Sequence, residues 1–223
     1  MWDTNFNKVK IIGFDLDQTL YPKSPEIDEA IQKYIYEKIA SRLNIDTETA
    51  REKFRALYQE GRGLSGSKSL VALGFDTEEA KESVQEALEK AEIAKFLVPD
   101  PRVVSLLSKL SDKYTLDLIT GSDRNNTDRK LKSLDIPRSI FRHIITKDDA
   151  DKSDGSAYKI WLAKYPEHSS DEFLYIGDRI RTDYEIPLEL GIRSILVNIN
   201  EPDESLRSLQ LTNLLEIERY LVV

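Results

Sequence analysis

Short apolar segments recur along the chain, and segments with helical patterning lie between them. The apolar segments are largely continuous rather than alternating, which is typical of strands covered on both faces. We predict five strands, at residues 9–14, 116–119, 143–146, 173–176 and 192–197. We predict helices between them at residues 100–110, 125–134, 156–164 and 184–190. Strands that alternate with helices indicate an α/β fold, a doubly wound domain built around a parallel sheet.

One segment, residues 24–96, interrupts this alternation because its signals are almost all helical. Ser24 followed by Pro25 supplies an N-cap and a proline at the first helical position. Asp76 with Glu79 fits a capping box at the start of a charged helix. We therefore predict an all-helical domain inserted after the first strand.

These signals divide the chain into two domains. Residues 1–22 and 98–223 are predicted to form the core domain, and residues 23–97 the helical domain. Within the helical domain, residues 60–67 contain three glycines and two serines, so this segment is predicted to be a flexible loop.

The charge of the chain restricts its partners. It carries 32 basic and 40 acidic residues, a formal net charge of -8. Such a surface repels phosphate backbones, which argues against a nucleic acid polymer as partner but permits a small anionic substrate in a local cationic pocket. No apolar run approaches the roughly 18 residues that cross a bilayer, and residues 1–5 lack the pattern of a signal peptide. We expect a soluble, cytoplasmic protein with no membrane partner; nothing in the sequence predicts its oligomeric state.

The chain has no cysteine and only two histidines, His143 and His168. Disulfides, thiol nucleophiles and thiolate metal sites are therefore excluded. The histidines are far apart and lack metal-ligand spacing, so we interpret each as a surface or half-buried residue. Acid–base chemistry at neutral pH must fall mainly to carboxylates, lysine or tyrosine.

The first predicted strand ends in an acidic motif. Residues 14–21 read Phe-Asp-Leu-Asp-Gln-Thr-Leu-Tyr, with Asp15 and Asp17 two positions apart. In extended chain such side chains point the same way, and the carboxyl ends of parallel strands face the ligand crevice of an open sheet. Both carboxylates are therefore candidates for chemistry at that edge. The alternative interpretation is a solvated acidic turn that ends the strand.

Three further features follow at the ends of later strands or in the loops beyond them. Thr120 comes at the end of the second predicted strand, and Lys152 lies just before a helix. Asp178 and Asp183 follow the fourth strand in the segment Gly-Asp-Arg-Ile-Arg-Thr-Asp. Each has a structural alternative, as a turn threonine, a solvated lysine or helix-capping aspartates. Their joint placement at one edge of the sheet argues against those alternatives.

This ordered set of motifs resembles the four motifs of the haloacid dehalogenase superfamily. The helical insertion lies where the first subfamily of that superfamily carries its helical cap. The resemblance covers nearly the whole chain and implies a Rossmann-like core with a cap domain. Residues 19–22, Thr-Leu-Tyr-Pro, and residues 57–64 are also similar to the pyrimidine 5'-nucleotidase branch, in a narrower way.

The resemblance implies a role for each motif residue. Asp15 matches the nucleophile that forms an aspartyl-phosphate, a form of covalent carboxylate catalysis. Asp17 matches the general acid–base, which protonates the leaving oxygen and then activates water. Thr120, Gly121 and Lys152 match the groups that bind phosphate.

The resemblance also implies a magnesium site. Its ligands would be Asp15, Asp178 and the main-chain carbonyl of Asp17, with Asp183 in support. Elementary electrostatics agrees, because close carboxylates repel by about 4 kcal/mol per unit pair at an effective dielectric constant near 20. Magnesium suits such a site because it accepts one or two carboxylates together with substrate oxygen and water.

Substrate choice is expected to depend mainly on the helical domain. Candidates to face the leaving group are Tyr21, Arg62, Leu64, Ser65 and Ser67. Arg62 could pair with a second anionic group of a substrate. Its alternative is a solvated arginine in a loop.

Three positions depart from the family pattern. Gln18 stands where glycine or asparagine is more common, and Gly121 follows Thr120 where asparagine is common. Pro187 falls where a helix should begin, so we expect that helix to be short or to begin late.

These observations predict a magnesium-dependent phosphatase acting on a small phosphorylated metabolite, such as a nucleotide, a sugar phosphate or an organic-acid phosphate. A first alternative is a 2-haloacid dehalogenase, although halide leaves without protonation or a metal, so Asp17, Asp178 and Asp183 favour phosphate chemistry. A second alternative is a catalytically silent relative that acts as a binding protein.

Overall fold

The computed structural model describes residues 6–22, 24–58 and 66–221 of the chain. The chain forms two compact units, Met1–Pro22 with Leu97–Val223, and Lys23–Phe96. The sequence placed this boundary one residue later, with Leu97 in the helical domain. No helix in the described ranges has both the length and the apolar character needed to cross a lipid bilayer.

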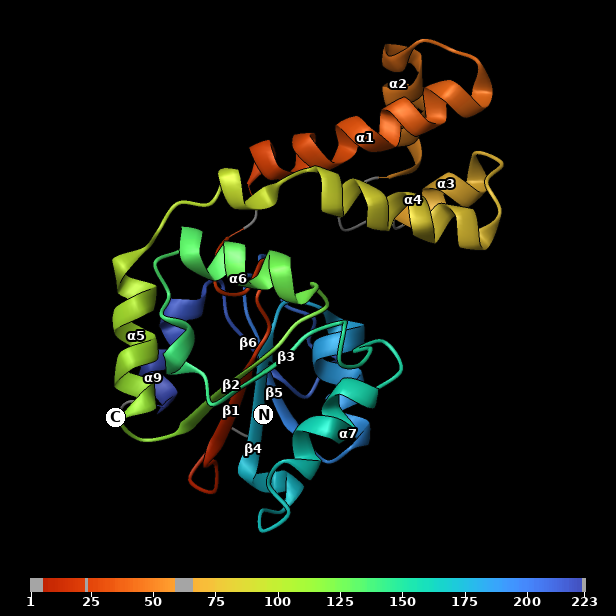
Figure 1. Cartoon of the computed structure of the whole chain (residues 1–223). Helices are drawn as coiled ribbons and strands as arrows, with labels where there is room; N and C mark the ends of the chain where they lie inside the picture. The colour runs from red at the N-terminus through yellow and green to blue at the C-terminus, as the bar shows by residue number, and fades with distance from the viewer. Residues whose placement is uncertain (1–5, 23, 59–65, 222–223) are drawn as a thin grey trace. The chain divides into compact units, whose positions relative to one another are not determined.

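A six-stranded parallel sheet forms the centre of the first unit (Figure 1). Its strands are β1 Ile11–Phe14, β2 Thr115–Ile119, β3 His143–Ile145, β4 Phe173–Gly177, β5 Arg193–Leu196 and β6 Leu209–Gln210. The order β3-β2-β1-β4-β5-β6 reverses direction at β1, so the predicted doubly wound sheet is confirmed. All five predicted strands are present. The sequence missed β6 because two residues carry no readable period.

Helices cover both faces of this sheet, with α5 and α9 on one side and α7 on the other (Figure 1). The α-helices of the first unit are α5 Pro101–Ser111, α6 Arg124–Ser133, α7 Ser156–Ala163, α8 Ile186–Glu189 and α9 Glu218–Leu221. A π-helical segment spans Ile180–Glu185, and 3₁₀ turns span Arg138–Ile140, Ser170–Glu172 and Leu214–Ile217. The expectation of a short, late helix at Pro187 is confirmed, because α8 follows the π-helical segment and has four residues.

The layer between α7 and the sheet is packed around Trp161. A Cβ atom at Gly13 would lie 2.7 Å from the Trp161 ring, so the indole occupies the space that a side chain on β1 would need. The buried carboxylate of Asp117 on β2 accepts hydrogen bonds from Trp161 Nε1 at 2.8 Å and from Tyr165 Oη at 2.6 Å. It also accepts from the backbone N–H of His143 at 2.7 Å, so one carboxylate links β2, β3 and the end of α7.

The second unit is all-helical, as predicted. Its helices are α1 Pro25–Leu43, α2 Thr47–Leu57, α3 Gly66–Ala72 and α4 Thr77–Lys90, followed by a 3₁₀ turn at Ile93–Lys95. Ser24 Oγ accepts a hydrogen bond from the Ile27 N–H, and Asp76 accepts one from the Glu79 N–H, so both predicted N-caps are present. The helices enclose a separate apolar core that includes Ile39 and Phe54.

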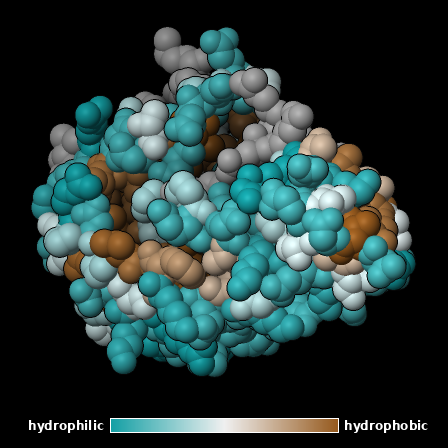
Figure 2. All heavy atoms as spheres, turned by 90° about the horizontal axis from the view of Figure 1, so that it is seen from above, coloured by the Kyte–Doolittle hydropathy of each residue, from teal (hydrophilic) through white to brown (hydrophobic). Residues whose placement is uncertain are grey.

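The molecular face in Figure 2 is largely hydrophilic, with hydrophobic residues gathered in a few patches. Ion pairs such as Arg42–Glu79, at 2.9 Å between α1 and α4, are partly exposed. Exposed pairs of this kind contribute only about 0–1 kcal/mol each. Stability therefore depends mainly on the apolar layers and on buried polar groups such as Asp117.

We predict that Asp117→Ala lowers the free energy of unfolding by at least about 3 kcal/mol. Two buried donors and one part-buried donor lose their acceptor, and each unsatisfied buried group costs about 1–3 kcal/mol. The matched control is Asp112→Ala, at an exposed position at the end of α5, with an expected change within about 0.5 kcal/mol. Urea denaturation of both variants measures the difference. Equal midpoints would contradict a structural role for Asp117.

Candidate active site

The chain turns sharply where it leaves β1, and this turn carries two of the predicted residues. The N–H of Asp15 donates to the Ile176 carbonyl at 2.8 Å, which continues the pairing of β1 with β4. Gln18 has φ 59, in the left-handed region, and its carbonyl accepts a hydrogen bond from the Asn198 side chain. This conformation favours glycine and asparagine. It gives a physical reason why glycine or asparagine would be expected at position 18.

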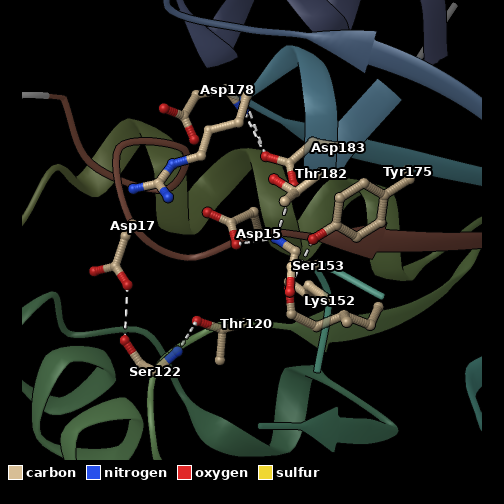
Figure 3. Close-up of polar contacts among 12 residues, drawn as sticks. Asp15, Asp17, Thr120, Ser122, Lys152, Ser153, Tyr175, Asp178, Thr182 and Asp183 are labelled. Carbon is tan, nitrogen blue, oxygen red and sulfur yellow. Dashed lines mark hydrogen bonds and ion pairs between the residues drawn. The ribbon is translucent and has the colours of Figure 1, made fainter. Parts of the chain in front are cut away.

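Three carboxylates converge beyond the carboxyl ends of β1 and β4. Asp15, Asp178 and Asp183 each offer an oxygen atom within 4.8 Å of the other two (Figure 3). Asp15 comes from the turn after β1 and Asp178 from the residue after β4. Asp183 lies in the π-helical segment and has 0% of its surface exposed. Segments far apart in sequence therefore bring three negative charges to one point.

Asp183 is held against the end of β4 by backbone groups. Its Oδ2 accepts hydrogen bonds from the N–H groups of Asp178 and Arg179, both at 3.1 Å. A Cβ atom at position 177 would lie 2.4 Å from Asp183 Oδ2. Only glycine at position 177 therefore lets the carboxylate approach the strand this closely.

Lys152 is the buried cation of this cluster, with 6% of its surface exposed. Its Nζ lies 2.5 Å from Asp15 Oδ1 and 2.8 Å from Asp183 Oδ1. The ammonium also lies 5.1 Å from the centre of the Tyr175 ring, which is a cation–π distance. One lysine thus pairs with two of the three carboxylates.

Burial and mutual repulsion both act on the carboxylates of the cluster. Burial, with repulsion from Asp183, raises the pKa of Asp15 to about 6 although Lys152 opposes the shift. Burial and repulsion from Asp15 raise the pKa of Asp178 to about 7. Burial alone would lower the pKa of Lys152, but Asp15 and Asp183 hold it above its usual value.

The cluster fits a hard divalent cation. All its donor atoms are carboxylate oxygens, the ligands that magnesium prefers. Asp178 Oδ1 is buried and accepts no hydrogen bond from the described part of the chain. Such an oxygen atom is costly unless it gains a partner. Asp15, Asp178 and Asp183 could therefore hold magnesium.

The side chain of Asp17 points away from this cluster, toward Ser122 (Figure 3). Its Oδ1 accepts hydrogen bonds from Lys130 Nζ at 2.5 Å and from Tyr21 Oη, and its Oδ2 accepts one from Ser122 Oγ at 2.7 Å. Burial alone would raise the pKa of Asp17, but Lys130 and the hydroxyl donors bring it below the usual value. The pKa of Asp17 is therefore shifted in the direction opposite to that of Asp15.

Thr120 and Gly121 form the end of β2 beside these groups. Thr120 is buried, and its Oγ1 accepts a hydrogen bond from the Ser122 N–H at 3.1 Å. The hydroxyl hydrogen of Thr120 stays available to an acceptor, because its oxygen is the acceptor in that bond. A Cβ atom at Gly121 would meet nothing within 4 Å, so the backbone there is open to an approaching ligand.

The structure thus brings together every predicted motif residue at one edge of the sheet. Of the specificity candidates, Tyr21 contacts Asp17 through its hydroxyl, and Ser67 lies in α3 of the second unit. The remaining three lie outside the described residues: Arg62, Leu64 and Ser65.

Sequence reasoning missed Lys130, a buried residue on α6. The signal was present, because Thr127, Lys130, Leu131 and Leu134 have the i, i+3, i+4, i+7 spacing of a buried helical stripe. A lysine within such a stripe requires a buried partner. The many charged neighbours in this helix hid the pattern.

Solved structures with similar folds include three relevant proteins. The YfnB protein of Bacillus subtilis, described as bound to magnesium, matches with a TM-score of 0.66 and 16% identity over 96% of this chain and 99% of its own. A HAD phosphatase from Thermococcus onnurineus has a TM-score of 0.61 and 21% identity over 95% of this chain and 97% of its own. A 2-haloacid dehalogenase from Pseudomonas syringae has a TM-score of 0.57 and 21% identity over 96% of this chain and 98% of its own.

At these identities the structures show a shared fold. The sequence itself gives a more specific result, because the family model for haloacid dehalogenase-like hydrolases matches residues 12–197. That match covers most of the chain and includes both ends of the motif set, from Asp15 to Asp183. The chain therefore belongs to the haloacid dehalogenase-like hydrolase family.

Proposed function

We propose that this protein is a magnesium-dependent phosphatase that hydrolyses a small phosphomonoester in the cytoplasm. The observation that carries the proposal is the convergence of Asp15, Asp178 and Asp183, with a buried oxygen of Asp178 that accepts no hydrogen bond from the described residues. Lys152 pairs with Asp15 and Asp183, and Arg179 is a second positive charge that acts on Asp178. A divalent cation would give that oxygen a partner, offset the repulsion that remains among the carboxylates and bind phosphate oxygen.

In the first half-reaction, a carboxylate oxygen of Asp15 attacks phosphorus while the bond from phosphorus to the leaving oxygen breaks. Asp17 gives its proton to that leaving oxygen. Thr120 Oγ, the open backbone at Gly121 and Lys152 Nζ bind the phosphoryl oxygens. A magnesium ion held by Asp15, Asp178 and Asp183 would supply charge neutralisation, so that an anionic nucleophile could approach an anionic group.

In the second half-reaction, water hydrolyses the aspartyl-phosphate. Asp17 takes a proton from the water molecule as its oxygen attacks phosphorus, and the bond between phosphorus and Asp15 breaks. Inorganic phosphate leaves, and Asp17 again carries the proton that it gave in the first step. Each half-reaction therefore needs both aspartates, but in different roles.

The substrate in this proposal is a phosphorylated metabolite small enough to react at a buried aspartate. A nucleotide is one candidate, on the narrower similarity to pyrimidine 5'-nucleotidases, and a sugar or organic-acid phosphate is another. Arg62, Leu64, Ser65 and Ser67 remain the proposed specificity residues of the helical domain.

A 2-haloacid dehalogenase is the second candidate, supported by one similar fold. That chemistry also uses an aspartate nucleophile, but halide leaves without a proton. It gives no role to the orphaned oxygen of Asp178 or to the paired carboxylate of Asp17. A catalytically silent binding protein is disfavoured by the same contacts, because Asp15, Asp17 and Lys152 all keep the hydrogen bonds and ion pairs that the proposed reaction needs.

The metal requirement gives the first functional prediction. Magnesium should raise the midpoint of thermal unfolding. At a concentration 100 times its dissociation constant, the ion should add about 2.7 kcal/mol to the free energy of unfolding. Turnover of p-nitrophenyl phosphate should require the ion and stop in excess chelator. Calcium should inhibit, because its longer bonds and higher coordination number alter the hold on Asp15.

The matched pair for this test is Asp178→Asn and Asp112→Asn. The first variant should lose both the magnesium-dependent shift and the turnover, and the second should keep both. Undiminished turnover in chelator would overturn the metal requirement and favour the dehalogenase.

Substitutions of the two aspartates of the first motif should have different effects on turnover. Asp15→Asn removes the attacking oxygen and should abolish turnover. Asp17→Asn keeps the nucleophile, and p-nitrophenolate leaves without protonation, so this variant should release about one p-nitrophenol per site and then turn over slowly. The slow phase follows because general base catalysis typically contributes about 10²–10⁴-fold.

Rapid-quench kinetics measures the burst, and mass spectrometry after acid quench locates the phosphoryl group. We expect it on the peptide that contains Asp15. Label on Thr120 or Ser122, or full activity of Asp15→Asn, would contradict the proposed mechanism.

A further inference from the structure

Asp17 is held by three donors from two parts of the first unit. Lys130 Nζ donates to its Oδ1 at 2.5 Å and to Ser122 Oγ at 2.8 Å. Ser122 Oγ in turn donates to Asp17 Oδ2 at 2.7 Å, and Tyr21 Oη donates to Oδ1. Lys130 thus contacts the aspartate both directly and through the serine hydroxyl.

The lysine reaches Asp17 from a fixed position. Lys130 has 5% of its surface exposed and lies on α6 between the buried residues Thr127 and Leu131. The helix is capped by Asp123, which accepts from the Asn126 N–H at 2.8 Å and, through its carbonyl, from Thr127 Oγ1 at 2.7 Å. A functional group supported by a packed helix is held more precisely than one on a loop.

The three donors determine which oxygen of Asp17 can exchange a proton. A carboxylate offers about four acceptor positions, two on each oxygen. Lys130 and Tyr21 occupy both positions on Oδ1, and Ser122 occupies one on Oδ2. One position therefore remains, on Oδ2.

Lys130 also offsets a charge that would otherwise be unpaired. Without it, Asp17 would be a fourth carboxylate, partly buried and without a cation in contact, beside Asp15, Asp178 and Asp183. Like charges at close range repel by several kcal/mol at intermediate dielectric. The side chain of Asp17 would then turn toward solvent, away from the position in which it can serve the reaction.

We propose that Lys130 is a positioning residue that, with Ser122, fixes Asp17 so that Oδ2 is the oxygen that gives a proton to the leaving group and takes one from water. This inference rests on the proposed phosphatase function. Lys130 acts through Asp17, so its removal should affect the steps in which Asp17 transfers a proton and leave phosphate binding unchanged.

The test is a double-mutant cycle of Lys130→Met and Asp17→Asn, with p-nitrophenyl phosphate as the probe. Lys130→Met should keep the burst of p-nitrophenol and lower the steady-state kcat by about 10–100-fold, part of the about 10²–10⁴-fold that general base catalysis contributes. KM should stay within about twofold. Because residues that act through one another are not additive, Lys130→Met should cost nothing further in the Asp17→Asn background.

Two other variants complete the design. Lys132→Met removes an exposed lysine from the same helix and should leave kcat unchanged. Ser122→Ala removes the bridging hydroxyl while both charges stay paired, and should lower kcat by a smaller factor than Lys130→Met. If Lys130→Met does not fold, Ser122→Ala still tests the inference. The double variant Lys130→Met/Asp17→Asn, which lacks both charges, then serves as the second comparison.

The outcomes separate this inference from the proposed function. Three results would overturn the role of Lys130. They are an equal loss of kcat on Lys130→Met in the wild-type and Asp17→Asn backgrounds, a raised KM with unchanged kcat, and an equal loss of kcat in Lys132→Met. A wild-type protein that hydrolyses no phosphomonoester with any divalent ion would overturn the proposed function itself, and the positioning role with it.

Discussion

The structure depends on how the repulsion between carboxylates at one edge of the parallel sheet is offset. These carboxylates are Asp15, Asp17, Asp178 and Asp183. Each pair of such charges would cost several kcal/mol at close range without compensation. Two buried lysines, Lys152 and Lys130, provide part of that compensation from different elements. The fold must therefore hold these elements together tightly enough to offset the repulsion.

Several features of the fold serve this purpose. The central strand β1 places Asp15 next to β4, where backbone pairing continues beyond the strand. The π-helical segment folds Asp183 back onto the end of β4, and Gly177 leaves the space that its carboxylate fills. A wider helical turn frees backbone groups for other contacts and is frequent at functional sites. Local irregularity thus occurs where the charges have to meet.

Much of this could be predicted from the sequence because the signals are local. Continuous apolar segments predicted five of the six strands, and aspartates that directly follow strands β1 and β4 identified the acidic motifs. The contacts of Lys130 could not be predicted, because they join residues 113 positions apart and depend on how α6 packs. The short strand β6 and the π-helical segment also have no period of their own. Tertiary contacts, rather than local preference, determine those features.

The two lysines also explain how neighbouring aspartates can take different roles. Lys152 is shared between Asp15 and Asp183, so burial dominates and the pKa of Asp15 rises to about 6. Lys130 pairs with Asp17, which two hydroxyls also contact, so the pKa of Asp17 falls despite its burial. A carboxylate with a lowered pKa stays ionised at neutral pH, which suits Asp17 to take a proton from water in the second half-reaction. A lysine on α6, outside the recognised motifs, therefore contributes to that difference together with the motif residues.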